Sequence, residues 1–328
     1  MISKAKIHSA ILVMALLFSE YASAEWQLRE FNVMGTRARV EFWSTDKALS
    51  ATLHEQVEAD MRRIDASMSP YKPDSELSAI NQKAAEQAVV VSRELFALIK
   101  RSIDYSQLTS GAFDITFSSV GFFYDYRQHQ RPSSEQIEKH LAGINYRHLV
   151  LNDEQGSVAF KSQGVRIDLG GIAKGHAVDR AIDILKRGGI KHAYVSAGGD
   201  SYALGNRGDR PWMIAIKHPR DKTRSLLTIP LENLAISTSG DYERYFDENG
   251  VRYHHIINPK TGDSARNSQS VTILADNSTD ADALSTSVFV LGPEKGLQLI
   301  DKTPNVSAVI VDKDGKVHYS SDLVSIDQ

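Results

Sequence analysis

One short stretch of this chain, residues 168–175, constrains the fold more than any other. It reads Asp-Leu-Gly-Gly-Ile-Ala-Lys-Gly. The residues before it, 164–167, are mostly apolar and β-branched, and the residues after it place alanine, isoleucine and leucine at helical spacing over 172–186. The pattern predicts a strand that ends at Asp168 and turns through a glycine pair into a helix.

This turn is a candidate site for a nucleotide phosphate. Unpaired backbone N–H groups and the positive end of the helix dipole favour an anion at a helix N-terminus. Glycine lets a ligand approach the main chain closely, and Lys174 adds a positive charge. A turn of the same kind that binds no ligand is the alternative interpretation of these residues.

The N-terminus is predicted to be a signal peptide, residues 1–24. Lys4 and Lys6 precede an apolar run over 10–18, and the small residues Ala-Ser-Ala at 22–24 suit cleavage. The apolar run is too short to span a bilayer, and the chain has no cysteine that a lipid could modify. We therefore expect an exported, periplasmic protein with no stable membrane anchor after cleavage.

Composition argues against nucleic acid as a partner. The formal net charge is −3, and the charged residues, 24% of the chain, are spread evenly without a basic block. Residues 25–328 contain no linker or repeat, so we expect one catalytic unit.

Both helices and strands are predicted, which makes the fold class α+β, with mixed sheets and packed helices. Short strands dominate after residue 149. The predicted helices cover 49–64, 93–108, 172–187 and 279–291, and the predicted strands are 26–33, 37–43, 192–196, 212–217, 226–230, 253–257, 270–274, 306–311 and 317–320.

The predicted helix 279–291 carries oxygen groups that suit a divalent cation. Asp282 and Thr286 are four residues apart and Ser285 lies three after Asp282, so the three side chains share one face. A carboxylate with hydroxyls suits Mg²⁺, which prefers oxygen ligands. Such residues near a helix start are more often caps, but Thr279 is available as the cap. An inward-facing Asp282 in the second turn then needs a partner.

Several short motifs accompany these two segments in a fixed order. They are Met34-Gly35-Thr36, Ser69-Pro70-Tyr71 with Ser75-Glu76-Leu77 and Asn81, Phe113-Asp114-Ile115-Thr116, Ala197-Gly198-Gly199-Asp200, Ser237-Thr238-Ser239-Gly240 and His255-Ile256-Ile257-Asn258-Pro259-Lys260-Thr261-Gly262. Together with the two segments they resemble the ApbE family of FAD:protein FMN transferases over about residues 30–290. The resemblance implies an ApbE-like flavin transferase fold with the FAD site in a cleft. It also implies Mg²⁺-dependent transfer of FMN from FAD to a threonine of a target flavoprotein, with AMP leaving.

The resemblance also assigns roles to individual residues. Substitution at a diphosphate needs charge neutralisation and in-line placement of the nucleophile more than covalent help from the enzyme. Lys174 would hold phosphate and Asp168 would contact the cofactor. For Asp114, a turn-stabilising role is the alternative. The implied metal ligands are Asp282, Thr286, Ser285 and the backbone carbonyl of Gly171, and the residues implied to line the flavin or adenine pocket are Met34, Tyr71, Asp114 and Ile256.

His255 is the candidate general base for the acceptor threonine, because the unperturbed pKa of imidazole is near neutrality. A structural histidine bonded to the backbone of a strand is the alternative. His254 is expected on the opposite face of the sheet, so the pair does not predict a zinc site.

Two further functions share these residues. An FAD pyrophosphatase would deliver the same phosphoryl group to water, and a non-catalytic flavin carrier would bind FAD without using Asp282 and Thr286. As a transferase, the protein would act on flavin subunits of membrane redox complexes or on exported flavoproteins. Ile115 and the aromatic, charged segment 118–132 depart from the family pattern, which predicts altered cofactor packing or acceptor preference there.

Overall fold

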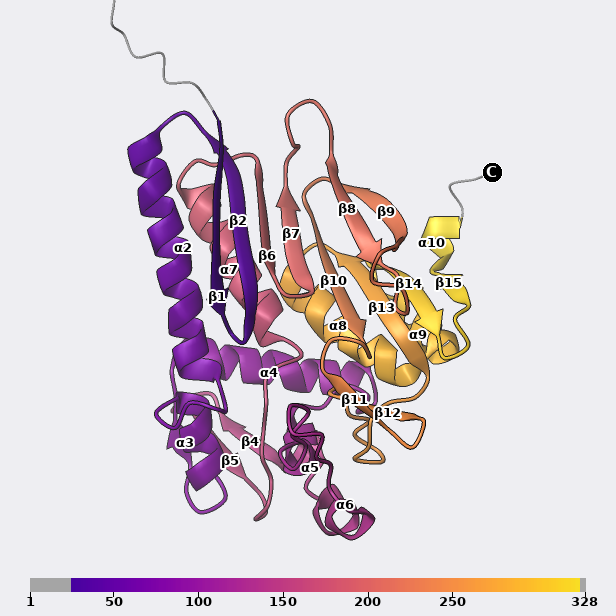
Figure 1. Ribbon diagram of the computed structural model, residues 1–328. Helices are drawn as coiled ribbons and strands as arrows, with labels where there is room; N and C mark the ends of the chain where they lie inside the picture. The colour runs from indigo at the N-terminus through magenta and orange to yellow at the C-terminus, as the bar shows by residue number, and fades with distance from the viewer. Residues whose placement is uncertain (1–24, 325–328) are drawn as a thin grey trace, which may run out of the picture.

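An eight-stranded sheet, antiparallel at every neighbouring pair, forms the centre of the computed structural model (Figure 1). The structure describes residues 25–324, so the predicted signal peptide lies outside the described residues. The α+β class is confirmed. In sheet order the strands are β1 (Glu25–Val33), β2 (Thr36–Ser44), β6 (Ala193–Ala197), β7 (Asp200–Leu204), β10 (Leu234–Gly240), β13 (Ser268–Ala275), β14 (Ser307–Asp312) and β15 (Val317–Tyr319).

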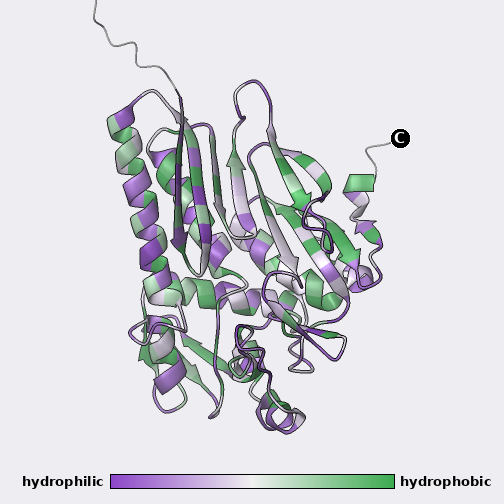
Figure 2. Cartoon of the chain, viewed as in Figure 1, coloured by the Kyte–Doolittle hydropathy of each residue, from purple (hydrophilic) through white to green (hydrophobic). Residues whose placement is uncertain are grey.

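Helices cover one face of this sheet. Alternate strand residues such as Val40, Phe42 and Val195 are fully buried beneath them, and Phe42 contacts His54 of the first helix. Figure 2 shows hydrophobic and hydrophilic residues alternating along that helix, as expected for one buried and one exposed side. The covering helices are α2 (Lys47–Met68), α7 (Ala173–Arg187), α8 (Ser278–Leu291) and α9 (Pro293–Ile300).

The opposite face is covered in part by a hairpin, β8 (Trp212–Lys217) with β9 (Ser225–Leu231). Trp212 packs against Trp26 and Tyr194, with ring centroids 5.2 and 5.5 Å away. Tyr194 alternates along β6 with buried residues of the helical side, so both faces of the sheet contribute to the core. No helix within residues 25–324 has the length and apolar character of a membrane span.

A smaller layer lies across one end of the sheet, below α4 (Arg93–Leu108) in Figure 1. It consists of a three-stranded sheet and short helices that sequence periodicity did not reveal, because each is only two to eight residues long. Its members are α3 (Glu76–Lys83), β3 (Val89–Val90), η1 (Ile115–Phe117), α5 (Ser118–Gly121), α6 (Ser134–Leu141), η2 (Tyr146–His148), β4 (Leu149–Asn152) and β5 (Ser157–Phe160). The remaining elements are β11 (Tyr245–Glu248), β12 (Val251–His254) and α10 (Ser321–Val324).

The predicted strand before the glycine turn is wrong. Residues 165–169 are extended but pair with no strand. Side chains hold them instead: Asn81 accepts from the Ile167 N–H at 2.7 Å and donates to its carbonyl at 2.9 Å, while Ser119 accepts from the Arg166 N–H at 3.0 Å. A buried segment held by side-chain hydrogen bonds has the same hydrophobic pattern as a paired strand, so the pattern could not distinguish the two structures.

Two smaller corrections concern element ends. The strand predicted over 253–257 ends at His254, and the cap of α8 is Asn277, whose side chain accepts from the Asp280 N–H. Thr279, the predicted cap, donates to Asp179 of α7. The other predicted helices and strands are confirmed to within a few residues at each end, including Ser92 as the cap of α4.

Gly175 is required where α7 crosses α8. A Cβ at this position would lie 2.2 Å from the Ser278 carbonyl oxygen and 2.9 Å from the Asp282 Cβ. We expect Gly175→Ala to lower the free energy of unfolding by about 1–3 kcal/mol, because the helices must separate. Urea unfolding measures the loss. Asp183→Ala, at an exposed position of the same helix, is the control and should change stability by less than about 0.5 kcal/mol.

Candidate active site

Three turns and the end of one strand meet at the end of the sheet above α4 (Figure 1). They are the β1–β2 turn, the β6–β7 turn, the glycine turn before α7 and the C-terminal end of β10. Small residues allow this convergence: a Cβ on Gly198 would lie 3.0 Å from Thr36 Oγ1, and one on Gly171 would lie 3.2 Å from Thr286 Oγ1. The glycine turn and the predicted metal ligands of α8 are therefore neighbours, although more than a hundred residues separate them in the sequence.

A lysine between two carboxylates lies at the centre of this edge. Lys174 Nζ is 2.5 Å from Asp200 Oδ2 and 3.4 Å from Asp282 Oδ2. Both carboxylates are buried, and the lysine side chain is 23% exposed. The predicted phosphate-binding cation is thus engaged by two acidic side chains.

The N-terminus of α7 points toward Asp282. No side chain caps this helix, and Asp282 Oδ2 accepts from the Gly175 N–H at 3.0 Å. A carboxylate at this position interacts favourably with the helix dipole. The Gly175 N–H is therefore a hydrogen-bond partner of the kind that the buried Asp282 carboxylate requires.

Hydroxyl groups surround the same carboxylates. Ser285 Oγ lies 2.8 Å from Ser239 Oγ and 3.1 Å from Ser237 Oγ, and Ser239 is 3.4 Å from Thr286 Oγ1. Ser237 donates to Asp200 at 2.5 Å. This buried, oxygen-rich donor set fits a hard divalent cation such as Mg²⁺. Within residues 25–324, no three acidic, histidine or cysteine side chains lie close enough together to hold a metal. Hydroxyl and carbonyl oxygens would therefore complete the ligand set.

Burial and mutual repulsion perturb these groups. Burial, followed by the charge of Asp200, raises the pKa of Asp282 to about 7, although Lys174 and the Gly175 N–H oppose the rise. Burial lowers the pKa of Lys174, but Asp200 and Asp282 more than offset this and hold it above its ordinary value. A second cation beside Asp282 would favour its charged form.

The two adjacent histidines differ sharply in their contacts. His254 is buried, with Nε2 2.7 Å from the Ala265 carbonyl and Nδ1 accepting from the Ile256 N–H at 3.3 Å. His255 Nδ1 is buried and has no hydrogen-bond partner within the described residues. His254 is therefore a structural histidine bonded to the backbone. Burial, followed by the charge of Arg244, lowers the pKa of His255 to about 3, so the ring is neutral near pH 7.

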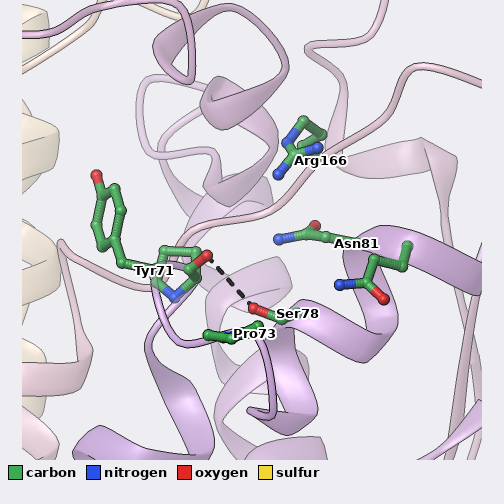
Figure 3. A pocket seen from close by; sticks show the side chains of 7 residues that line it. Tyr71, Pro73, Ser78, Asn81 and Arg166 are labelled. Carbon is green, nitrogen blue, oxygen red and sulfur yellow. Dashed lines mark hydrogen bonds between the residues drawn. The ribbon is translucent and has the colours of Figure 1, made fainter.

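A pocket of about 230 Å³ is lined by Tyr71, Asn81 and Arg166, and Arg166 lies two residues before Asp168. Figure 3 shows Asn81 and Arg166 on one side of it and Tyr71 on the other. The Tyr71 side chain is 80% exposed, so its ring is open to a ligand. Asp168 accepts from the Gly170 N–H at 2.6 Å, and burial raises its pKa.

The remaining predicted pocket residues have mixed surroundings. Asp114 is buried and accepts from the Thr116 N–H and hydroxyl and from the Tyr146 N–H, which are the contacts of a turn-stabilising residue. Met34 is half-buried with a φ of 52°, and Ile256 is 5% exposed. Contact of these three residues with a flavin or adenine ring stays a prediction.

Asp200 is the main residue of the site that sequence reasoning passed over. It belongs to the motif Ala197–Asp200, but nothing in its spacing ties it to Lys174 or Ser237. The sheet order, which places β7 beside β10, creates both contacts.

Comparison with known proteins identifies the class as the flavin transferases. A FAD:protein FMN transferase from Haemophilus influenzae is 34% identical over 315 residues, covering 90% of this chain and 90% of that protein. One from Treponema pallidum is 33% identical and covers 93% and 88%. The flavin transferase ApbE from Vibrio cholerae has a similar structure, with a TM-score of 0.83 at 30% identity, covering 92% of this chain and 99% of its own.

The chain belongs to the ApbE family, whose model matches residues 34–310. The ApbE protein from Thermotoga maritima has a TM-score of 0.85 at 36% identity, covering 93% of this chain and 100% of its own. The resemblance seen in the motifs is confirmed, and so are the transferase activity and the use of FAD.

Proposed function

We propose that this protein transfers FMN from FAD to a threonine hydroxyl of an acceptor flavoprotein in a Mg²⁺-dependent reaction that releases AMP. The observation that carries the proposal is the meeting of Asp282, Ser285 and Thr286 with Gly171 at the N-terminus of α7. That edge combines oxygen ligands for a hard cation with backbone N–H groups for a phosphate.

In this proposal Asp282, Thr286, Ser285 and the carbonyl of Gly171 hold Mg²⁺. When bound, the ion neutralises charge on the diphosphate and orients the leaving AMP. The protein keeps Lys174 beside Asp200 and Asp282, which balances charge when the ion is absent. The exposed Tyr71 and the turn at Met34 flank the flavin and adenine ends of the dinucleotide.

His255 removes the proton of the acceptor threonine. Its ring is neutral near pH 7, so it can accept a proton. FMN and the threonine oxygen form a new P–O bond, the P–O bond to AMP breaks, and the proton leaves on the imidazole.

We expect His255→Ala to lower the rate of FMN transfer at saturating acceptor by about 10²- to 10⁴-fold. FAD affinity and thermal stability should change less than the transfer rate, because the buried Nδ1 has no hydrogen-bond partner to lose. Transfer is measured as the FMN mass added to the acceptor. His254→Ala is the contrast: it removes two buried hydrogen bonds and should mainly lower the melting temperature. A normal transfer rate in His255→Ala would leave His255 a packing role.

The proposal includes export to the periplasm, where acceptors would be subunits of membrane redox complexes or exported flavoproteins. It is supported by the charged, apolar and small-residue pattern of residues 1–24.

One assay tests the proposed function. The chain from residue 25 onward is incubated with FAD, Mg²⁺ and a threonine-containing flavoprotein, and both AMP and acceptor mass are recorded. Equal amounts of AMP and FMN-modified acceptor, both lost with EDTA, are expected. AMP with free FMN and unmodified acceptor would identify a pyrophosphatase, and bound FAD without AMP would identify a carrier.

A further inference from the structure

The electrostatic balance of the site leaves a bound diphosphate short of positive charge. Three carboxylates, Asp168, Asp200 and Asp282, lie around the glycine turn, and Lys174 is already paired with two of them. A diphosphate brings further negative charge to the same place. Mg²⁺ at the proposed position offsets part of it, and the remainder requires a cation that is not held by an acid.

Arg244 meets that requirement. It lies between the end of β10 and the start of β11, is exposed, and within residues 25–324 its guanidinium has neither a hydrogen-bond nor an ion-pair partner. The arginines that line the pocket at Met34 and Gly35 are paired with acids: Arg37 pairs with Glu30, and Arg62 pairs with Glu58. A free guanidinium can bind a phosphate through two parallel N–H bonds.

Arg244 lies beside the predicted cofactor residues. Its Nη2 would lie 3.5 Å from a Cβ on Gly35, so the guanidinium covers the turn that carries Met34. Its backbone carbonyl accepts from the His255 N–H at 3.2 Å. Its charge also opposes the rise that burial causes in the pKa of Asp168 and of Tyr71. The guanidinium is therefore within electrostatic reach of Tyr71 and of Asp168 beside the glycine turn.

We propose that Arg244 is a substrate-binding residue that contacts the diphosphate of FAD. This inference rests on the proposed function and adds a residue to which neither the motifs nor the resemblance assigned a role. Negative charge develops on the leaving AMP phosphate as its bond to FMN breaks, so the contact strengthens FAD binding and supports turnover.

Arg244→Gln tests the inference. We expect FAD affinity, measured by quenching of flavin fluorescence with Mg²⁺ present, to fall about 10- to 100-fold, since one charge-assisted pair is lost. The affinity of the parent chain should fall as NaCl rises, and that of Arg244→Gln should fall less steeply. Arg244→Lys keeps the charge but not the planar fork and should recover part of the affinity.

Arg187→Gln is the matched control. Arg187 is also an exposed arginine without a partner among the described side chains, and it lies at the far end of α7 from the glycine turn. Its FAD affinity and salt dependence should equal those of the parent. The melting temperature without FAD should be the same in all four proteins, which separates binding from folding.

Unchanged FAD affinity in Arg244→Gln, or a loss with the same salt dependence as the parent, would overturn the role of Arg244. Failure of the proposed function gives a different result. FAD affinity would still be lower in Arg244→Gln than in Arg187→Gln, but the parent chain would leave the acceptor unmodified.

Discussion

Asp282→Asn is expected to abolish AMP release from FAD, with a rate loss of about 10³-fold or more, because it removes the carboxylate of the proposed metal site. Asparagine keeps the shape of the side chain and an oxygen that can accept from the Gly175 N–H. FAD binding should weaken less than turnover. The measurement is AMP formation by chromatography over a range of Mg²⁺ concentrations.

The same substitution should not destabilise the fold near neutral pH. Burial and Asp200 raise the pKa of Asp282 from 3.8 to about 7, so between these values the folded chain binds more protons than the unfolded chain. Stability contributed by this group therefore falls as pH rises from about 4 to 7. Asparagine does not ionise, so the variant avoids this loss of stability. Without metal, Asp282→Asn should therefore melt at or above the temperature of the parent at pH 7.5.

Asp276→Asn is the control for this change. Asp276 is exposed just before α8, and its side chain accepts one hydrogen bond within residues 25–324, from Asn305, so the variant should keep full activity. Normal Mg²⁺-dependent turnover in Asp282→Asn would contradict the metal assignment. Inactivity combined with a large drop in melting temperature would instead indicate a structural role.

Local spacing was enough to predict that the proposed metal ligands of α8 share one face of the helix. Asp282, Ser285 and Thr286 lie on one helix, and the helical repeat alone puts them on one face. Apolar alternation likewise predicted β1, β2 and the β14–β15 hairpin. These features depend on residues close together in the sequence.

The rest of the site depends on contacts between distant segments. Lys174 was assigned to phosphate because it follows the glycine turn, yet the sheet order places Asp200 2.5 Å from its amine. The approach to the glycine turn looked like a strand, but Asn81, 86 residues before Ile167, supplies both backbone hydrogen bonds of Ile167. A single sequence shows neither partner, because side-chain hydrogen bonds across the fold leave no periodic signal.

Lys174→Met should destabilise the protein by about 3–5 kcal/mol, because it leaves Asp200 and Asp282 without a counter-charge in a buried site. Methionine retains the apolar stem of lysine, so the loss comes from charge rather than volume. Stability is measured by urea unfolding without metal. It should recover as the pH is lowered from about 8 to 6, since protonation of Asp282 removes one of the two charges.

A second substitution separates charge balance from phosphate binding as the role of this lysine. If Lys174 balances the carboxylates, the double variant Lys174→Met with Asp200→Asn should regain much of the lost stability, because one unpaired charge is then gone. Added Mg²⁺ should also stabilise Lys174→Met more than the parent, since the charge of the ion would offset the unpaired carboxylates. If the main role of Lys174 is to hold phosphate, Lys174→Met will fold with nearly normal stability and lose FAD affinity, and Asp200→Asn will restore nothing.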